Sequence, residues 1–143
     1  MSKDLGDDFA DHIVNTRYET LPPEAVEAAK KSVLDILGVI LTASGLEPAV
    51  HGVMDLVQET GGRPESSLLG FGGRAPASWA AFANGAMAHS MDFDDLTPWG
   101  NHATSSIVPA ALAVAERNGR VSGKELVGSI PCGQGLFARL VSN

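Results

Sequence analysis

Side chains that can transfer protons or bind metal ions gather in one short segment, residues 89–102, between two apolar stretches. The segment holds three aspartates, two of the chain's four histidines and a tryptophan. A histidine beside carboxylates is well suited to exchanging a proton near neutral pH. Three carboxylates this close repel one another, so the cluster needs a cation, a proton or wide exposure to solvent.

The residue types alone leave three interpretations of this segment open. The first is a solvated loop between helices, in which an Asp or Ser caps the next helix. The second is a divalent-metal site formed by Asp92, Asp94, Asp95 and His102, because oxygen-rich clusters suit Mg²⁺ or Ca²⁺. The calcium-loop pattern, with a central glycine and a terminal glutamate, is absent. The third is acid/base catalysis.

Other chemistry-bearing residues give weaker signals. Cys132 has no partner base nearby in the sequence, and a free cysteine is more often a small buried apolar group. The glycines of residues 70–73 lack both the full dinucleotide-binding pattern and the Gly-Lys-Ser/Thr ending of a phosphate loop. His12 and His51 occur singly in predicted helices, and we interpret them as surface or boundary residues.

The composition excludes several functional classes. The net charge of −7 argues against binding to nucleic acid or to an anionic membrane surface. A single cysteine cannot form an internal disulfide and indicates a reducing compartment. The N-terminal residues are polar and acidic, unlike a signal peptide, and the longest apolar stretch, residues 33–41, is too short to span a bilayer. A cytoplasmic location is predicted.

Helical periodicity dominates the elements that must position the acidic segment. Apolar residues recur at spacings of three and four, and prolines and glycines mark the ends of the helices. The predicted helices cover residues 5–16, 22–45, 48–60, 76–88 and 107–118. Residues 66–71 are either a brief strand or an extended link. Residues 80–88 are mostly small, which favours a buried helix that another backbone approaches closely.

The last segment begins well and then carries residues that disfavour a helix. Ser122 and Glu125 form a capping-box pattern. The helix that they start is predicted to be damaged by Gly128, Pro131, Gly133 and Gly135, because an internal proline costs about 3 kcal/mol and a glycine up to about 1. The chain then ends in apolar residues. We therefore predict one all-α domain over residues 1–143, bundle-like and incomplete.

Several motifs in this order resemble the N-terminal part of the MmgE/PrpD family, which includes 2-methylcitrate dehydratase, cis-aconitate decarboxylase and iminodisuccinate epimerase. The most specific is Asn-Gly at 84–85 followed by His89 and by Asp-Phe-Asp-Asp at 92–95. The other matching pieces are Tyr18 with Leu-Pro-Pro-Glu at 21–24, Leu-Asp-Ile-Leu-Gly at 34–38, His102, residues 108–116 and residues 122–126.

The resemblance implies a fold and an activity. The fold is a large all-helical domain, assembled from N- and C-terminal parts of a much longer chain, with a smaller α+β lid domain that this sequence lacks. Such proteins are usually homodimers and require no cofactor and no metal ion. Their shared chemistry moves a proton next to a carboxylate of a small polycarboxylate substrate, coupled to loss of water, loss of carbon dioxide or inversion.

The resemblance also implies which residues belong to the site. Asp92 and His102 match two pocket residues and are the predicted catalytic pair, and Asp95 and Thr97 are predicted to bind substrate. His102 would transfer the proton, while Asp92 would orient it or bind a substrate hydroxyl. The three carboxylates repel a polyanion, so cationic side chains from later sequence are expected to complete the site.

Two departures from the family pattern concern the reaction itself. The decarboxylases have Thr directly after Asp-Asp, whereas this chain has Leu96 there and Thr97 one place later. The usual His-Pro-Ser reads His-Ala-Thr at 102–104. Dehydration, decarboxylation and epimerisation all stay open, and so does the identity of the acid. The alternative function is a catalytically inert helical fragment that associates with itself or with a partner.

Overall fold

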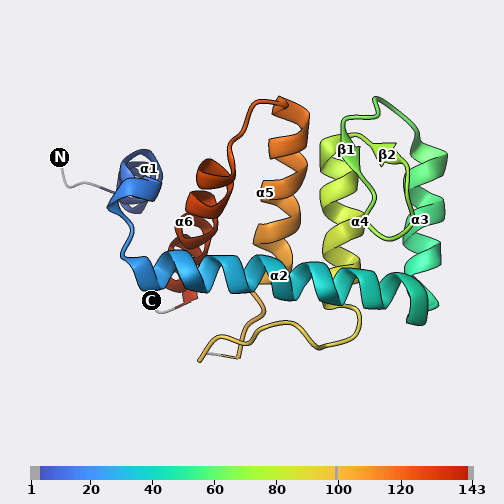
Figure 1. Ribbon diagram of the computed structural model, residues 1–143, viewed down its shortest axis with the longest axis horizontal. Helices are drawn as coiled ribbons and strands as arrows, with labels where there is room; N and C mark the ends of the chain where they lie inside the picture. Colours follow the sequence, from blue (N-terminus) through green and yellow to red (C-terminus); the bar gives the residue numbers. More distant parts are fainter. Residues whose placement is uncertain (1–3, 99, 142–143) are drawn as a thin grey trace.

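The computed structural model describes residues 4–98 and 100–141, and within them the regular secondary structure is helical apart from one small hairpin (Figure 1). Trp99, part of the acidic segment, lies outside the described residues. The elements are α1 Leu5–Asn15, a 3-10 turn η1 Tyr18–Thr20, α2 Pro23–Leu46, α3 Ala49–Thr60, β1 Ser66–Ser67, β2 Arg74–Ala75, α4 Ala77–His89, α5 Thr104–Asn118 and α6 Gly123–Val141. The predicted all-α fold is confirmed.

The long helix α2 runs across a row formed by α6, α5, α4 and α3 (Figure 1). The hairpin lies at one end of α4, and the loop that joins α4 to α5 lies at the opposite end, beyond α2. The acidic segment occupies this loop. Its position is therefore set by the end of one helix and the beginning of the next.

The core forms where α2 meets the row of helices. Ile36 and Ile40 of α2 pack in one cluster with Met87 of α4, Val108 of α5 and Ile130 of α6, and each of these side chains is at most 1% exposed. Burying a side chain of this size contributes about 1.5–3 kcal/mol. The apolar face that the periodicity predicted for α2 thus packs against α4, α5 and α6.

Small residues let α4 and α5 approach closely, as the sequence predicted. Ala80, Ala83 and Ala88 of α4 are fully buried, and a Cβ atom on Gly85 would lie 3.5 Å from the backbone carbonyl of Ser105. Pro109 lies inside α5 and has no N–H, so this carbonyl lacks its usual helical partner. The close contact fixes the end of α4 relative to the start of α5.

The prediction for the last segment was wrong, because α6 is a continuous helix from Gly123 to Val141. It includes all four residues expected to damage it, Gly128, Pro131, Gly133 and Gly135. Packing explains the difference, since most helix stability in proteins comes from tertiary contacts rather than from propensity. Gly128 packs on the backbone of Tyr18, and a Cβ atom on Gly133 would come within 2.9 Å of Ile107. These glycines are points of close approach between helices.

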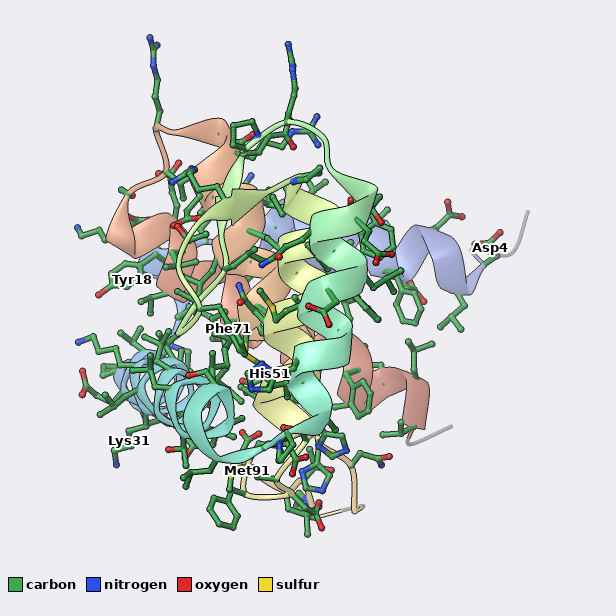
Figure 2. All side chains as sticks on the ribbon, turned by 90° about the vertical axis from the view of Figure 1, so that its right-hand side faces the viewer. Asp4, Tyr18, Lys31, His51, Phe71 and Met91 are labelled. Atoms are coloured by element: carbon green, nitrogen blue, oxygen red, sulfur yellow. The ribbon has the colours of Figure 1, made fainter. Side chains whose placement is uncertain are left out.

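The two histidines outside the acidic segment make packing contacts away from the site. His12 Nε2 lies 3.2 Å from the carbonyl oxygen of Cys132, which joins α1 to α6. His51 is exposed, and its ring meets the edge of Phe71 with centroids 5.2 Å apart (Figure 2). Both therefore lie at the surface or at its boundary, as predicted.

Among the described helices, none is by itself long and apolar enough to cross a membrane. One pair bent by 95°, Pro23–Leu46 with Ala49–Thr60, passes that test of length and composition only when its two helices are taken together.

Candidate active site

The acidic loop is held at both ends by helices and within by short turns. His89 is the last residue of α4, and His102 lies just before α5, where its carbonyl oxygen accepts a hydrogen bond from the Ser105 hydroxyl at 2.8 Å. Asp92 has a φ of +55°, a left-handed conformation that Asp tolerates better than most residues. These features turn the chain back on itself, so that the two histidines become neighbours with ring centroids 4.6 Å apart.

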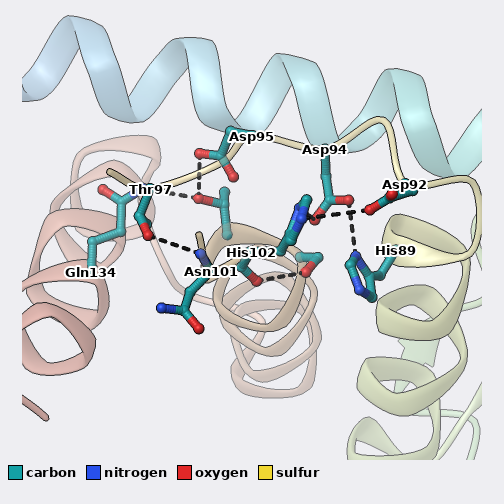
Figure 3. Close-up of polar contacts among 10 residues, drawn as sticks. His89, Asp92, Asp94, Asp95, Thr97, Asn101, His102 and Gln134 are labelled. Carbon is teal, nitrogen blue, oxygen red and sulfur yellow. Dashed lines mark hydrogen bonds and ion pairs between the residues drawn. The ribbon is translucent and has the colours of Figure 1, made fainter. Parts of the chain in front are cut away.

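Asp94 is the buried centre of the loop, and its side chain is 0% exposed. Its Oδ1 lies 3.0 Å from Nδ1 of His89, in hydrogen-bonding geometry, and its Oδ2 lies 3.2 Å from Nδ1 of His102 (Figure 3). One carboxylate therefore faces two imidazoles. A buried carboxylate is costly unless it is paired, so these two contacts are what allow Asp94 to be buried.

The contact between Asp94 and His102 is close but not aligned as a hydrogen bond. Asp94 Oδ2 and His102 Nδ1 are both buried, and neither has a hydrogen-bond partner among the described residues. Catalytic hydrogen bonds are often poorly aligned without a ligand and tighten when substrate binds. A small rotation of the His102 ring would satisfy both atoms at once.

The structure brings together the two residues predicted to be catalytic. Asp92 Oδ1 lies 3.5 Å from Nε2 of His102, and the Asp92 side chain is 81% exposed. The His102 ring, which is 22% exposed, thus has a carboxylate near each of its nitrogens. Of the two carboxylates, that of Asp92 is accessible to solvent and that of Asp94 is buried.

Asp95 and Thr97, predicted to bind substrate, make contacts within the protein. Asp95 Oδ2 accepts a hydrogen bond of 2.6 Å from the Thr104 hydroxyl, which in turn accepts one of 3.0 Å from Gln134 of α6. The other oxygen of Asp95 is buried without a partner among the described residues. Thr97 Oγ1 accepts a hydrogen bond from the backbone N–H of Asn101 at 3.1 Å and closes the turn of the loop.

A cavity of about 570 Å³ opens beside the two histidines. Its lining includes both imidazoles, the side chains of Ser90, Ser105, Ser106 and Asn101, and Phe137 of α6. None of the described lining residues is a carboxylate. A ligand in this cavity would therefore meet hydroxyls, an amide and imidazoles, while the aspartates contact the histidines from outside its lining.

Four side chains could hold a metal ion. His89, Asp92, Asp94 and His102 each offer one ligand atom, and these atoms all lie within 4.8 Å of one another. Two imidazoles with two carboxylates suit several divalent ions. Asp95, which the metal hypothesis from the sequence included, is not in this group and binds Thr104 instead.

Sequence reasoning gave no catalytic or substrate-binding role to three residues that the structure places at or beside the site. His89 lay in the segment without an assignment, Asp94 was considered only as a metal ligand, and Gln134 was not considered. The position of His89 at the end of a predicted helix was a usable signal, because the chain must turn there toward the aspartates. Nothing in the sequence indicates that Gln134 reaches Thr104.

Comparison with known protein sequences identifies the family of this chain. The sequence model of the MmgE/PrpD N-terminal domain matches residues 7–142. The chain belongs to the MmgE/PrpD family. The motif of Asn-Gly, His and Asp-Phe-Asp-Asp has two parts with different positions in the structure. Asn84 hydrogen-bonds the backbone at the hairpin, and residues 89–95 form part of the site.

Two curated members of the family are similar over most of this chain. Cis-aconitate decarboxylase of Mus musculus is 31% identical over 117 residues, which cover 81% of this chain and 24% of the mouse enzyme. Cis-aconitate decarboxylase of Homo sapiens is 28% identical over 145 residues, which cover 99% of this chain and 30% of the human enzyme. The chain thus spans less than a third of the length of these relatives.

Proposed function

We propose that this chain is the N-terminal segment of a lyase or isomerase that acts on small polycarboxylates without a cofactor. The observation that carries the proposal is the placement of His102, between Asp92 and Asp94 and on the wall of the 570 Å³ cavity. Pockets for small ligands span about 300–1,000 Å³, so the size fits. Membership of a family that contains decarboxylases supports the reaction class.

The cavity answers the electrostatic objection raised by the sequence. Three aspartates in the loop repel a polyanion, but the described lining of the cavity contains no carboxylate; its polar residues are serines, Asn101 and the two histidines. The Ser106 hydroxyl and the Asn101 amide can donate hydrogen bonds to substrate carboxylates, and the two histidines can add charge when protonated. The hydroxyls of Ser90 and Ser105 already donate to backbone carbonyls. Within residues 75–116 the sequence has no Lys or Arg, so cationic side chains from elsewhere in the whole protein would supply the remaining charge.

The proposed chemistry is a proton transfer next to a substrate carboxylate. His102 exchanges the proton, and the exposed Asp92 either orients its ring or binds a substrate hydroxyl. Asp95 and Thr97 would reach substrate only by exchanging their present partners, Thr104 and the Asn101 backbone. The reaction is then dehydration, decarboxylation or epimerisation. We further propose a cytoplasmic homodimer that binds neither nucleic acid nor a membrane.

The test is an activity assay of the whole protein, expressed from the full reading frame of the source genome that contains this sequence. Citrate-like and aspartate-derived acids are the substrates tried. His102→Ala and Asp92→Asn should each lower turnover by about 10²-fold or more, the usual scale for a positioned acid/base group. His51→Ala is the matched control, because His51 is an exposed histidine on α3. Full activity of both site variants would reject the site.

A second function, association without catalysis, is favoured by the exposed apolar side chains of α2. Leu34, Leu41 and Leu46 are 74%, 59% and 70% exposed. Large uncovered apolar surfaces often mark interaction sites. The 143-residue chain should therefore associate at micromolar concentration, and sedimentation velocity measures this. A compact monomer, together with turnover by the whole protein, would remove this alternative.

A further inference from the structure

We propose that His89 is a second acid/base residue of the site and that Asp94 is the positioning residue that sets its tautomer. The inference extends the proposed function, which assigns proton transfer to His102 alone. It starts from the one well-aligned contact in the cluster, the hydrogen bond of 3.0 Å between Nδ1 of His89 and Oδ1 of Asp94.

The chemistry of the two atoms fixes which of them carries the hydrogen. A carboxylate can only accept, so a hydrogen bond to Asp94 requires the hydrogen on Nδ1 of His89. Nε2 of a neutral ring is then left with its lone pair, and it has no hydrogen-bond partner among the described residues. Because Asp94 is fully buried, the side chain that imposes this tautomer is itself held in place.

The position of His89 suits a group that meets substrate. Its side chain is 52% exposed, and it lines the same cavity as His102, with the two rings 4.6 Å between centroids. Two imidazoles at this separation can reach the same small molecule. Asp94 contacts both through different oxygens, so moving or removing this one carboxylate disturbs both rings.

Of the reactions in the proposed class, dehydration and epimerisation need one group that takes a proton and another that gives one, whereas decarboxylation needs only the group that gives one. In the forward direction, Nε2 of neutral His89 accepts the proton from the carbon next to the substrate carboxylate. The C–H bond breaks, an N–H bond forms, and the electron pair stays on the substrate. In a dehydration this electron pair forms the new C=C bond while the C–O bond of the leaving hydroxyl breaks, and His102 gives its proton to that hydroxyl, which departs as water. In an epimerisation the same electron pair takes the proton of His102 on the opposite face of the carbon. The imidazolium of His89 faces Asp94 until its proton passes to solvent.

The first experiment reads the tautomer and needs no turnover. Ring ¹⁵N chemical shifts of His89 in this chain, recorded above the histidine pKa range, should show hydrogen on Nδ1 and a bare Nε2. Asp94→Asn should abolish that preference, because an amide can also donate, and Asp55→Asn on α3 should leave it unchanged. Hydrogen on Nε2 in the unaltered chain would overturn the inference, whatever the activity of the protein.

The second experiment measures rates in the whole protein. His89→Gln should lower turnover by about 10²- to 10⁴-fold and remove one limb of the pH profile of kcat/KM, whereas His51→Gln should change neither. Asp94→Asn should lower kcat by a similar factor with KM nearly unchanged; in serine hydrolases an Asn in place of the orienting Asp costs about 10⁴-fold. Circular dichroism tests whether each variant folds. If His89→Gln does not fold, His89→Asn takes its place.

The outcomes separate this inference from the function on which it rests. Loss of activity in His102→Ala with full activity in His89→Gln would reject the role of His89 and keep the proposed function. Activity that survives every one of these substitutions would reject the proposed function, and the tautomer of His89 would still be decided by the ring shifts.

Discussion

Asn84 and Asp94 are both buried polar side chains, but Asn84 lies midway along α4 and Asp94 lies in the loop that follows it, and their hydrogen bonding differs. Asn84 is 3% exposed, and both ends of its amide are used: Oδ1 accepts from the Leu69 N–H at 3.0 Å, and Nδ2 donates to the Ser67 carbonyl at 2.9 Å. Asp94 leaves one oxygen without a hydrogen bond, beside an equally unsatisfied ring nitrogen of His102.

The difference separates a structural role from a functional one. Buried polar groups in folded proteins are nearly always hydrogen-bonded, and each exception needs an explanation. Asn84 fixes the hairpin to α4 and so contributes stability. Among the described residues, the cluster around Asp94 contains three buried polar atoms without a hydrogen bond, on Asp94, Asp95 and His102, and those of Asp94 and His102 face each other at 3.2 Å. Proteins keep such poorly satisfied groups mainly at functional sites.

The comparison predicts unequal losses of stability. Asn84→Ala should lower the free energy of unfolding by about 2 kcal/mol, because it leaves two backbone groups of the hairpin unpaired. Asp94→Asn, measured at pH 8 where most histidines are neutral, should cost less than about 1 kcal/mol, because it removes a buried charge and keeps the shape. Urea unfolding measures both, and Asn15→Ala, an exposed helix-end asparagine, is the control. A larger loss from Asp94→Asn than from Asn84→Ala would break the comparison.

Substitution of Thr104 should have an intermediate effect on the free energy of unfolding. Its hydroxyl links Asp95 to Gln134 of α6, and Thr104 is 1% exposed. Thr104→Val keeps the shape and removes one donor and one acceptor, so the free energy of unfolding should fall by about 1 kcal/mol. Thr42→Val, which removes an exposed hydroxyl on α2, should change it less. Equal effects would mean that the loop gains nothing from its contact with α6.

The exposed capping box of Ser122 and Glu125 at the start of α6 should have a still smaller effect on stability. The N–H and hydroxyl of Ser122 hydrogen-bond the Glu125 carboxylate and hold its pKa below the ordinary value of 4.5. A lowered carboxyl pKa stabilises the fold above the unfolded pKa, and that stability is lost as the pH falls through the folded pKa. Glu125→Gln should therefore lower the melting temperature slightly at pH 7, and the difference should vanish as the pH drops below 4.5. A difference that persists at low pH would assign the effect to packing rather than charge.

Metal binding is the smallest effect expected. Although four side chains of the site could hold an ion, we predict no tight binding, because the family resemblance points to metal-independent chemistry. Calorimetric titration with Mg²⁺, Ca²⁺, Mn²⁺ and Zn²⁺ should show no micromolar site. Micromolar binding that is lost in Asp94→Asn would instead make His89, Asp92, Asp94 and His102 a metal centre.

Prediction from sequence succeeded where local patterns decide the structure. The apolar spacing of α2 and the small residues of α4 predicted helices that the structure has, and most of the buried faces follow the pattern, although Leu41 of α2 is 59% exposed. The acidic loop was placed between helices correctly. It failed for α6, because helix propensity cannot show that Gly133 packs against Ile107 from another helix.

The same limit applies to the site. Asp92 and His102 were named through the motif, and the structure brings them to 3.5 Å. The burial of Asp94 and its contact with His89 depend on how the loop folds between α4 and α5, which spacing does not reveal. The hydrogen bond from Gln134 to Thr104 joins residues 30 apart in sequence, and no local pattern predicts it.

The continuity of residues 89–102 between α4 and α5 also has a consequence for the order of folding. Closing a loop of this size takes on the order of 100 ns, and contacts between neighbours in sequence form before distant ones. The pair of helices that frames the histidines can therefore assemble during synthesis, before α6 exists to contact it. We expect amide hydrogens of α4 and α5 to gain protection from exchange earlier in refolding than those of α6, so the site takes shape first and α6 adds Gln134 and Phe137 to it afterwards.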